Sequence, residues 1–277
     1  MKLKNYLSDS VWEGRKNRKI LDLSEANLST LPEELQEFEN LEELYLSNNN
    51  LIRLPIWFQQ FHKLRDLDLR GNYFSEFSYL LFCLPKLEFL NLEKNLISEI
   101  PKEIINLPEL EYLDISMNRL NSITDLIGYM RKLRYFLADK NQLSNLPKTL
   151  GNCESLTNLY LDENRIEEIP IDFGNLLNLT DLYLRNNRIT FLPKECKGWG
   201  KLQYIDLDNN LLTSLPDEVK FWVNIQDIYI ARNKITDFPE GIYQLKSLRE
   251  FIIKGNPIAE ESIKKLQTSI PQAIVYS

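Results

Sequence analysis

Two pairs of aspartates are the residues of this chain whose type and spacing could do chemistry. Asp66 and Asp68, and likewise Asp206 and Asp208, are separated by one residue within an apolar–polar alternation typical of a strand. Alternate residues of a strand point to the same face, which places the two carboxylates of a pair about 7 Å apart. That separation lies within the range of inverting glycosidases. The pairs are therefore candidates for carboxylate-based hydrolysis.

Other catalytic and metal chemistry finds little support. The single histidine, His62, and the three cysteines, Cys83, Cys153 and Cys196, match no zinc-site spacing. No glycine-rich motif that could cradle a phosphate occurs. We therefore expect no metal and no cofactor, three reduced and packed cysteines, and a solvated histidine.

The elements that position the aspartates are set by a strict internal period. Asparagine recurs every 23 residues, and a period held this long predicts a solenoid of stacked repeats. The recurring residues are Asn49, Asn72, Asn95, Asn118, Asn141, Asn164, Asn187, Asn210, Asn233 and Asn256. A side-chain amide can satisfy backbone groups of its own turn and of the adjacent one, so these residues are predicted to form a structural ladder.

Each repeat combines a strand pattern with a tight helical turn. One repeat reads Leu41, Leu44, Leu46, Asn49, Leu51, Leu54, Pro55, Phe58 and Phe61. The first half alternates like a strand, and proline opens the second half, where no backbone donor is needed. Ser78 and Thr124 replace this proline in two repeats. A single repeat cannot bury its apolar residues, so neighbours must stack into one core.

The template resembles that of leucine-rich-repeat proteins, of the short intracellular or bacterial type with Leu-Pro in each repeat, over residues 18–258. The resemblance implies an α/β fold: a right-handed horseshoe with a parallel sheet on the concave face and short helical or 3-10 turns on the convex face. We interpret residues 1–277 as a single domain. It has an N-terminal cap at 1–17, eleven 23-residue repeats at 18–258 with the last truncated, and a C-terminal helix and strand cap at 259–277.

Negative charge gathers on the predicted concave face. The third, fifth and seventh residues of each repeat point into the hollow of the horseshoe. Among them are thirteen acidic residues and three basic ones, a net of −10, whereas the whole chain carries −7. Such a field attracts a basic partner and repels nucleic acid. Solvation of an exposed sheet explains polarity but not this bias in sign.

Aromatic residues share the same positions in seven consecutive repeats. Sheet propensity and cross-strand stacking offer one explanation for them. Exposed aromatics at the centre of a surface are also typical of binding hot spots. The predicted partner-binding residues are Phe89, Tyr112, Asp114, Tyr135, Leu137, Asp139, Tyr160, Asp162, Tyr183, Arg185, Tyr204, Asp206, Asp208 and Tyr229.

These observations predict a non-enzymatic protein-interaction scaffold that binds a basic or basic and apolar protein segment. One alternative is a carbohydrate-binding or structural recognition module, in which tyrosines stack on sugar rings. The other alternative, a hydrolase, needs a deep cleft and one desolvated carboxyl, which an open sheet does not offer.

A second surface is predicted on the convex side, where apolar residues replace polar ones. It consists of Ile56, Trp57, Tyr79, Leu80 and Phe82, and it could be local core under a longer helix or a surface for weak self-association. No apolar run is long enough to span a bilayer, and residues 1–17 lack the pattern of a signal peptide. We expect a cytoplasmic protein that contacts no membrane.

Overall fold

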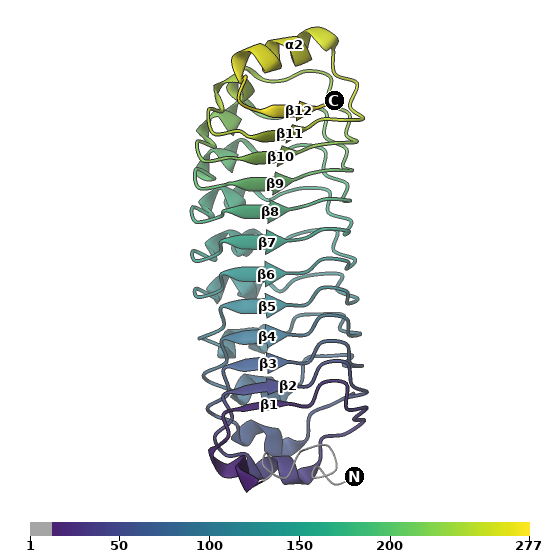
Figure 1. The fold of residues 1–277 in the computed structure, drawn as a ribbon, viewed down its shortest axis with the longest axis vertical. Coiled ribbons are helices and arrows are strands. Elements are labelled where there is room, and N and C mark those ends of the chain that lie inside the picture. The colour runs from purple at the N-terminus through teal and green to yellow at the C-terminus, as the bar shows by residue number, and fades with distance from the viewer. Residues whose placement is uncertain (1–12) are drawn as a thin grey trace. The chain divides into compact units, whose positions relative to one another are not determined.

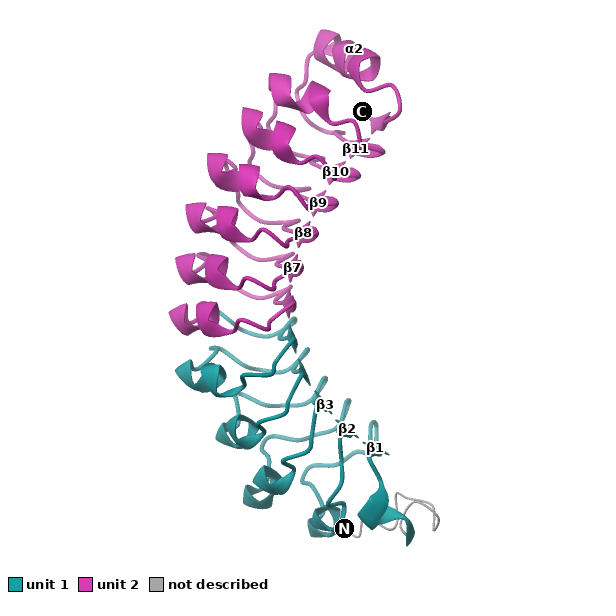
Figure 2. Cartoon of the chain, turned by 90° about the vertical axis from the view of Figure 1, so that its left-hand side faces the viewer, with its two compact units in different colours: residues 1–120 teal, residues 121–277 magenta. Residues whose placement is uncertain are grey.

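The computed structural model describes residues 13–277, so most of the cap predicted for residues 1–17 lies outside the described range. The chain divides into two compact units, residues 1–120 and residues 121–277 (Figure 2). Each unit is described by itself below. The single domain over residues 1–277 stays a prediction.

Unit 1 contains five parallel strands in chain order, β1 to β5, each followed or preceded by a 3-10 helix (Figure 1). The strands are β1 (Ile20–Asp22), β2 (Glu43–Tyr45), β3 (Asp66–Asp68), β4 (Phe89–Asn91) and β5 (Tyr112–Asp114). The 3-10 helices are η2 (Arg15–Asn17), η3 (Glu33–Glu37), η4 (Ile56–Gln60), η5 (Tyr79–Cys83) and η6 (Lys102–Asn106).

Unit 2 continues the same alternation and ends in an α-helix and a last parallel strand. The strands are β6 (Tyr135–Leu137), β7 (Asn158–Tyr160), β8 (Asp181–Tyr183), β9 (Tyr204–Asp206), β10 (Asp227–Tyr229), β11 (Glu250–Ile252) and β12 (Ile274–Tyr276). The helices are η7 (Asp125–Tyr129), η8 (Lys148–Asn152), η9 (Ile171–Asn175), η10 (Lys194–Gly198), η11 (Asp217–Phe221), η12 (Glu240–Gln244) and α2 (Glu260–Ser269). Figure 2 shows the 3-10 helices of this unit on one side and its strands on the other.

The core of each unit is built from the apolar positions of the repeat. In the repeat that begins at residue 156, the apolar side chains are at most 3% exposed: Leu156, Leu159, Leu161, Ile166, Ile169, Phe173 and Leu176. Equivalent residues of adjacent repeats lie opposite each other, as Leu159 and Leu182 do in the β7–β8 pair. The 23-residue period thus fixes the strand register, and stacking supplies the burial that one repeat lacks.

The second half of each repeat forms a 3-10 helix because its apolar residues recur at three-residue spacing. In unit 2 the residue before each 3-10 helix is extended, and it is proline in every case except Thr124 before η7. The hydroxyl oxygen of Thr124 accepts a hydrogen bond from the Leu126 amide at 3.4 Å, so Thr124 caps the N-terminus of η7 with its side chain. The 3-10 helices that follow proline have no such side-chain cap. The predicted short turns are therefore confirmed.

The recurring asparagines join neighbouring repeats from inside. Asn187 shows the pattern, since its Nδ2 donates to the carbonyl oxygens of Leu161 at 2.9 Å and Leu184 at 3.0 Å. Its Oδ1 accepts from the backbone amide of Ile166 at 3.0 Å. Within unit 1, Asn72 makes the three equivalent hydrogen bonds, to its own repeat and to the preceding one. One side chain therefore satisfies polar backbone groups in two turns that water cannot reach.

Unit 2 ends in α2 and β12, within the residues for which the sequence predicts a C-terminal cap (Figure 1). Leu266 and Ile270 are buried beneath it. Ser262 donates to Asp237 at 2.7 Å and Lys265 donates to Glu240 at 2.6 Å, which ties the helix to the last complete repeat. Among residues 13–277, no helix is both long and apolar enough to cross a membrane.

The two readings of the convex patch apply to different residues, and one expectation about the cysteines is wrong. Leu80 is only 1% exposed, as local core requires. It occupies the repeat position at which Gly241 lies directly against the preceding turn, so a side chain there packs between turns instead of facing solvent. Cys83 is exposed, whereas Cys153 and Cys196 are buried as expected. Of the predicted patch, Ile56 and Tyr79 are well exposed, and Trp57 and Phe82 are half-buried.

Candidate functional site: the sheet face of unit 2

Four tyrosines form a row on the outward face of the strands in unit 2. This sheet face corresponds to the surface predicted as concave. The rings of Tyr160 and Tyr183 are stacked with centroids 4.3 Å apart, and Tyr204 lies 4.7 Å from Tyr183. Tyr229 meets Tyr204 edge to face at 5.1 Å. We call these four residues the tyrosine row.

Strand register explains why the rings meet. Tyr160 of β7 is directly opposite Tyr183 of β8. Tyr204 of β9 pairs with Asp181 and so lies diagonal to Tyr183, within reach of an aromatic side chain. Burial raises the pKa values of the Tyr183, Tyr204 and Tyr229 hydroxyls, so these groups are protonated at neutral pH. The row offers apolar ring surface with hydrogen-bonding hydroxyls.

Several acidic residues of this face have a structural role that the sequence pattern did not reveal. Asp206, the last residue of β9, accepts a hydrogen bond at Oδ1 from the backbone amide of Asp208 at 2.9 Å. In unit 1, Asp68 and Asp114 accept from the residue two positions later in the same way, and Asn91 replaces aspartate with the same geometry. Because an amide can replace the carboxylate, this position selects an acceptor oxygen rather than a charge.

A second set of aspartates links one repeat to the next. Oδ1 of Asp139 accepts from the Asp162 amide at 2.7 Å, and Oδ1 of Asp162 accepts from the Arg185 amide at 2.7 Å. Asp208 accepts from the Ala231 amide at 2.6 Å. Each of these carboxylates thus gives a backbone amide of the next repeat a hydrogen-bond acceptor just beyond the end of the strand.

The aspartates beside the tyrosine row are poorly solvated. Burial, together with the negative charge of Asp139, raises the pKa of Asp162 to about 7. Burial raises the pKa of Asp206 to about 6, and it also raises the pKa of Asp208. Hydrogen bonds from backbone amides oppose these shifts without cancelling them. A bound cation would therefore interact with carboxylates that water solvates poorly.

Replacing Asp162 with asparagine is expected to stabilise the protein at pH 8 by about 1 kcal/mol. The folded pKa lies above the unfolded value, so the folded state binds more protons and its stability falls as the pH rises from about 4 to about 7. Asparagine keeps the acceptor for the Arg185 amide and removes the charge. Urea unfolding at pH 8 and near pH 5 measures the effect, and the gain over the natural protein should shrink at the lower pH.

Asp125→Asn is the matched control, because Asp125 is an exposed aspartate of η7 in the same unit. Its effect on the free energy of unfolding should be small and equal at both pH values. A pH-independent effect of Asp162→Asn would contradict the assignment of poor solvation to Asp162.

The predicted site is divided between the two units. Phe89 and Tyr112 are stacked in unit 1, with ring centroids 4.0 Å apart, and Asp114 lies beside them in β5. Asp114 is 6% exposed, as is Asp206 in unit 2. Both were expected to contact a partner, but their carboxylates are buried and accept hydrogen bonds from backbone amides two residues later.

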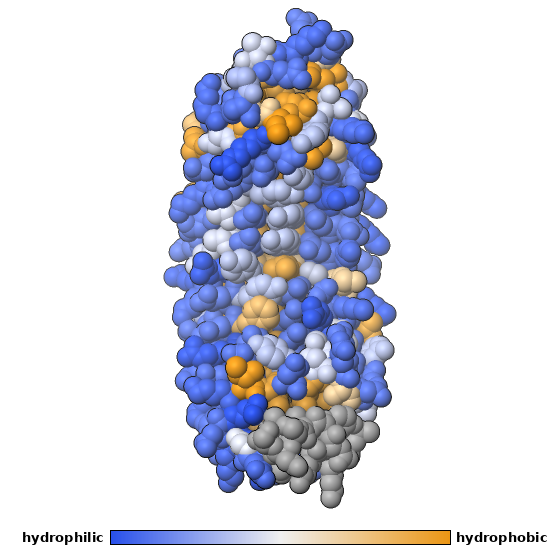
Figure 3. Space-filling view, viewed as in Figure 1, coloured by the Kyte–Doolittle hydropathy of each residue, from blue (hydrophilic) through white to orange (hydrophobic). Residues whose placement is uncertain are grey.

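The other predicted residues lie on the sheet face of unit 2. Tyr135 is exposed at the start of β6, Leu137 is half-buried at its end, and Arg185 is exposed. The positions around them are mostly polar, and Figure 3 shows a largely hydrophilic face with paler surface over the strands. Glu250, counted among the acidic residues of the predicted face but not among the partner-binding residues, accepts a hydrogen bond at Oε2 from the Tyr229 hydroxyl at 2.8 Å. Its place in the repeat adjacent to Tyr229 was the available signal.

The aspartate pair in unit 1 keeps one property of an acid–base site. Burial raises the pKa of Asp66 to about 6, and its buried Oδ1 has no hydrogen-bond partner. Its Oδ2 accepts from the Tyr45 hydroxyl at 3.3 Å. The pair is thus not fully solvated. A nearby hollow of about 390 Å³ is lined by asparagine-turn residues such as Asn48 and Tyr73, and neither Asp66 nor Asp68 lines it. Within residues 13–277, no three histidine, cysteine or acidic side chains gather closely enough to hold a metal ion.

Comparisons with known proteins identify the repeat. The family model described as a leucine-rich repeat region matches residues 57–169. Models described as leucine-rich repeats match residues 40–61, 154–212 and 200–258. The chain belongs to the leucine-rich-repeat proteins. No curated protein matches this leucine-rich-repeat protein in sequence.

Solved structures extend the similarity to most of the chain. A leucine-rich-repeat protein of Leptospira interrogans is 25% identical with a TM-score of 0.55, and the match covers 98% of this chain and 86% of that one. A plant peptide hormone receptor, RGFR1 in complex with RGF2, is 27% identical with a TM-score of 0.81, covering 97% and 45% of the two chains. The fold of this leucine-rich-repeat protein is thus a solenoid of the same class.

A third similar structure is the receptor kinase HAESA of Arabidopsis, in complex with the peptide hormone IDA and the co-receptor SERK1. It is 27% identical with a TM-score of 0.77, and the match covers 91% of this chain and 45% of that one. This leucine-rich-repeat protein therefore spans less than half the length of these plant receptor chains. Proteins of the family generally act in protein interactions, and their fold is typically a non-enzymatic binding module.

Proposed function

We propose that this chain is a non-enzymatic interaction module that binds an extended, basic segment of a protein or peptide along the sheet face of unit 2. The observation that carries the proposal is the tyrosine row flanked by poorly solvated carboxylates. No other described part of unit 2 combines adjoining tyrosine rings with raised aspartate pKa values.

The chemistry of this surface suits lysine and arginine side chains with apolar neighbours. Tyrosine rings present large, rigid contact area at low entropic cost, which is typical of interface hot spots. A guanidinium or ammonium group can lie over a ring and reach a carboxylate such as Asp162 or Asp208. Asp181 and Asp227 begin their strands on the same face and add negative charge that steers a basic partner.

The similar plant receptors support a peptide as the partner class, since RGFR1 and HAESA are described in complexes with RGF2 and IDA. The step from peptide to basic peptide rests on the charge of the sheet face in this chain. The cytoplasmic location expected from the sequence remains a proposal alongside it.

Equal-length labelled peptides test the proposal directly. A peptide of arginine, lysine, leucine and serine is expected to bind, whereas versions with glutamate or glutamine in place of the cations should bind at least about tenfold more weakly. Fluorescence anisotropy measures the dissociation constants. Raising NaCl from about 0.05 M to about 0.5 M should strongly weaken binding of the basic peptide, because exposed charges are screened.

Equal affinity for all three peptides would overturn the basic-partner proposal. The carbohydrate alternative makes the opposite prediction, because stacking of neutral sugars on tyrosine rings responds little to salt. Binding of a neutral oligosaccharide that is insensitive to salt, without binding of the basic peptide, would favour that alternative. The Asp66 carboxyl keeps hydrolysis as the second alternative, and release of reducing sugar from a glycan substrate would support it.

A further inference from the structure

Unit 2 contains a polar hollow of about 480 Å³ at the side where the chain enters strands β9 to β11. We call it the amide hollow. Its polar lining includes Gln203, Asn224, Gln226, Lys246, Arg249 and Gln272. The volume is in the range of small-molecule sites. None of these residues belongs to the tyrosine row.

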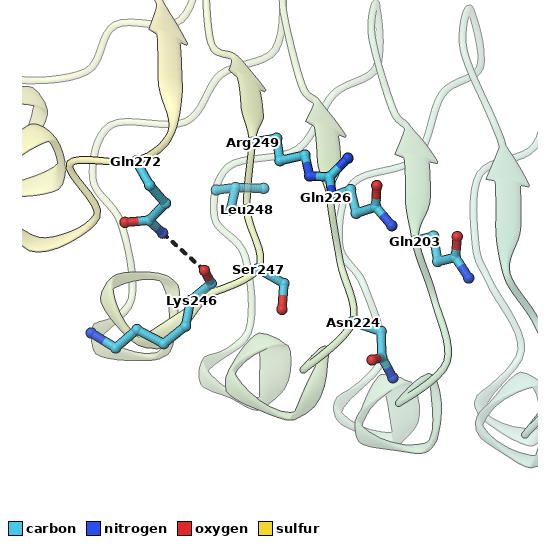
Figure 4. A pocket seen from close by; sticks show the side chains of 8 residues that line it. All are labelled: Gln203, Asn224, Gln226, Lys246, Ser247, Leu248, Arg249 and Gln272. Atoms are coloured by element: carbon cyan, nitrogen blue, oxygen red, sulfur yellow. Dashed lines mark hydrogen bonds between the residues drawn. The ribbon is translucent and has the colours of Figure 1, made fainter.

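The repeat aligns three of the side chains. Gln203, Gln226 and Arg249 each precede a strand at the same repeat position. The backbone amide of Gln226 donates to the backbone carbonyl of Gln203 at 2.8 Å, and the backbone amide of Arg249 donates to the backbone carbonyl of Gln226 at 2.7 Å. Figure 4 shows their side chains following one another along the hollow.

The wall of the hollow is fixed by hydrogen bonds to the backbone. Asn224 donates to the Gly200 carbonyl at 2.6 Å, and Ser247 donates to the Val223 carbonyl at 2.6 Å. Gln272 donates to the Lys246 carbonyl at 3.2 Å (Figure 4). These contacts hold the wall side chains in place, so the hollow is preformed.

The aligned groups themselves are left available. Within residues 13–277, the side chains of Gln203, Gln226, Arg249 and Lys246 make no hydrogen bond or ion pair to another residue. The Arg249 guanidinium and two side-chain amides therefore face the hollow with unused donors, whereas the Lys246 side chain extends away from them (Figure 4). The amides also carry unused acceptor oxygens.

The charge of the hollow is opposite to that of the chain. The chain carries −7, but no acidic residue lines the hollow, and both of its charged residues are cations. Asp227 and Glu250 follow Gln226 and Arg249 on the sheet face. Burial raises the pKa of Asp227, and the charge of Arg249 opposes this rise. A carboxylate of a ligand on the hollow side would meet the Arg249 guanidinium.

We propose that the amide hollow binds an acidic sugar, with the carboxylate on Arg249 and the hydroxyls on Gln203 and Gln226. Arginine matches a carboxylate through paired N–H donors. Glutamine amides donate and accept, as sugar hydroxyls require. No aromatic residue lines the hollow, so a neutral sugar would lack both a stacking surface and a charge partner.

Glucuronate, glucose and acetate are the probes. Glucuronate is expected to bind the full chain with a dissociation constant of about 1–10 mM, measured from backbone amide shifts in NMR titrations. Glucose lacks the carboxylate and acetate lacks the hydroxyls, so both should bind at least about tenfold more weakly. The shifting amides should be those around Gln226 and Arg249.

Arg249→Met should weaken glucuronate binding at least about tenfold. Gln203→Leu should weaken glucuronate binding while leaving acetate binding unchanged. Arg165→Met, which removes an exposed cation elsewhere in unit 2, is the control and should change nothing. Unchanged glucuronate affinity in Arg249→Met, or equal affinity for acetate and glucuronate, overturns the proposal. Peptide binding by the tyrosine row is measured separately and does not affect this outcome.

Discussion

Replacing Tyr160 and Tyr183 together with alanine is expected to weaken binding of the basic peptide about a hundredfold or more. The two rings are stacked on the sheet face, and truncation of a central interface aromatic typically costs about 2 kcal/mol or more. The fold should survive, because the inward residues of the same strands, Leu159 and Leu182, are fully buried and unchanged. Anisotropy titrations and thermal unfolding measure the two effects.

Tyr129→Ala is the matched control for this pair. Tyr129 is an exposed tyrosine of η7 in the same unit, with 68% of its surface exposed, and it lies outside the sheet. It should leave peptide affinity unchanged. Replacing Tyr160 and Tyr183 with phenylalanine should keep most of the affinity if the rings carry it. Full affinity in the double alanine variant would remove the tyrosine row from the site.

Asn187→Ala is expected to lower the free energy of unfolding by about 3 kcal/mol or more. The side chain donates to the carbonyls of Leu161 and Leu184 and accepts from the Ile166 amide. Alanine leaves these buried groups without partners, and each unsatisfied group costs about 1–3 kcal/mol. Urea unfolding gives the total. Hydrogen exchange should show faster exchange at Ile166, whose amide loses its acceptor.

Asn175→Ala provides the comparison, since Asn175 is exposed at the end of η9. Its loss should change stability by less than about 0.5 kcal/mol. A similar effect for both variants would mean that Asn187 does not stabilise the repeat junction. Repeat arrays can unfold in parts, so hydrogen exchange locates the loss that the total free energy only sums.

The repeat made the architecture predictable from the sequence. Because each residue's neighbours lie one period away, the alternation Leu159-x-Leu161 and the proline before η9 determined strand, core and turn. The ladder role of Asn187 followed from the same geometry, since a buried turn needs a donor and an acceptor at one place. Local pattern and period were enough for these features.

The sequence by itself determined the family, the core positions and the faces on which acid and tyrosine lie. Only the tertiary structure decided which aspartates are buried acceptors, as Asp114 and Asp206 are, and which neighbours lower their solvation. It also placed Leu80 between turns and assembled the amide hollow from Gln203, Gln226 and Arg249. The physical reason is that burial and pKa depend on all groups surrounding a side chain, whereas periodicity specifies only its direction.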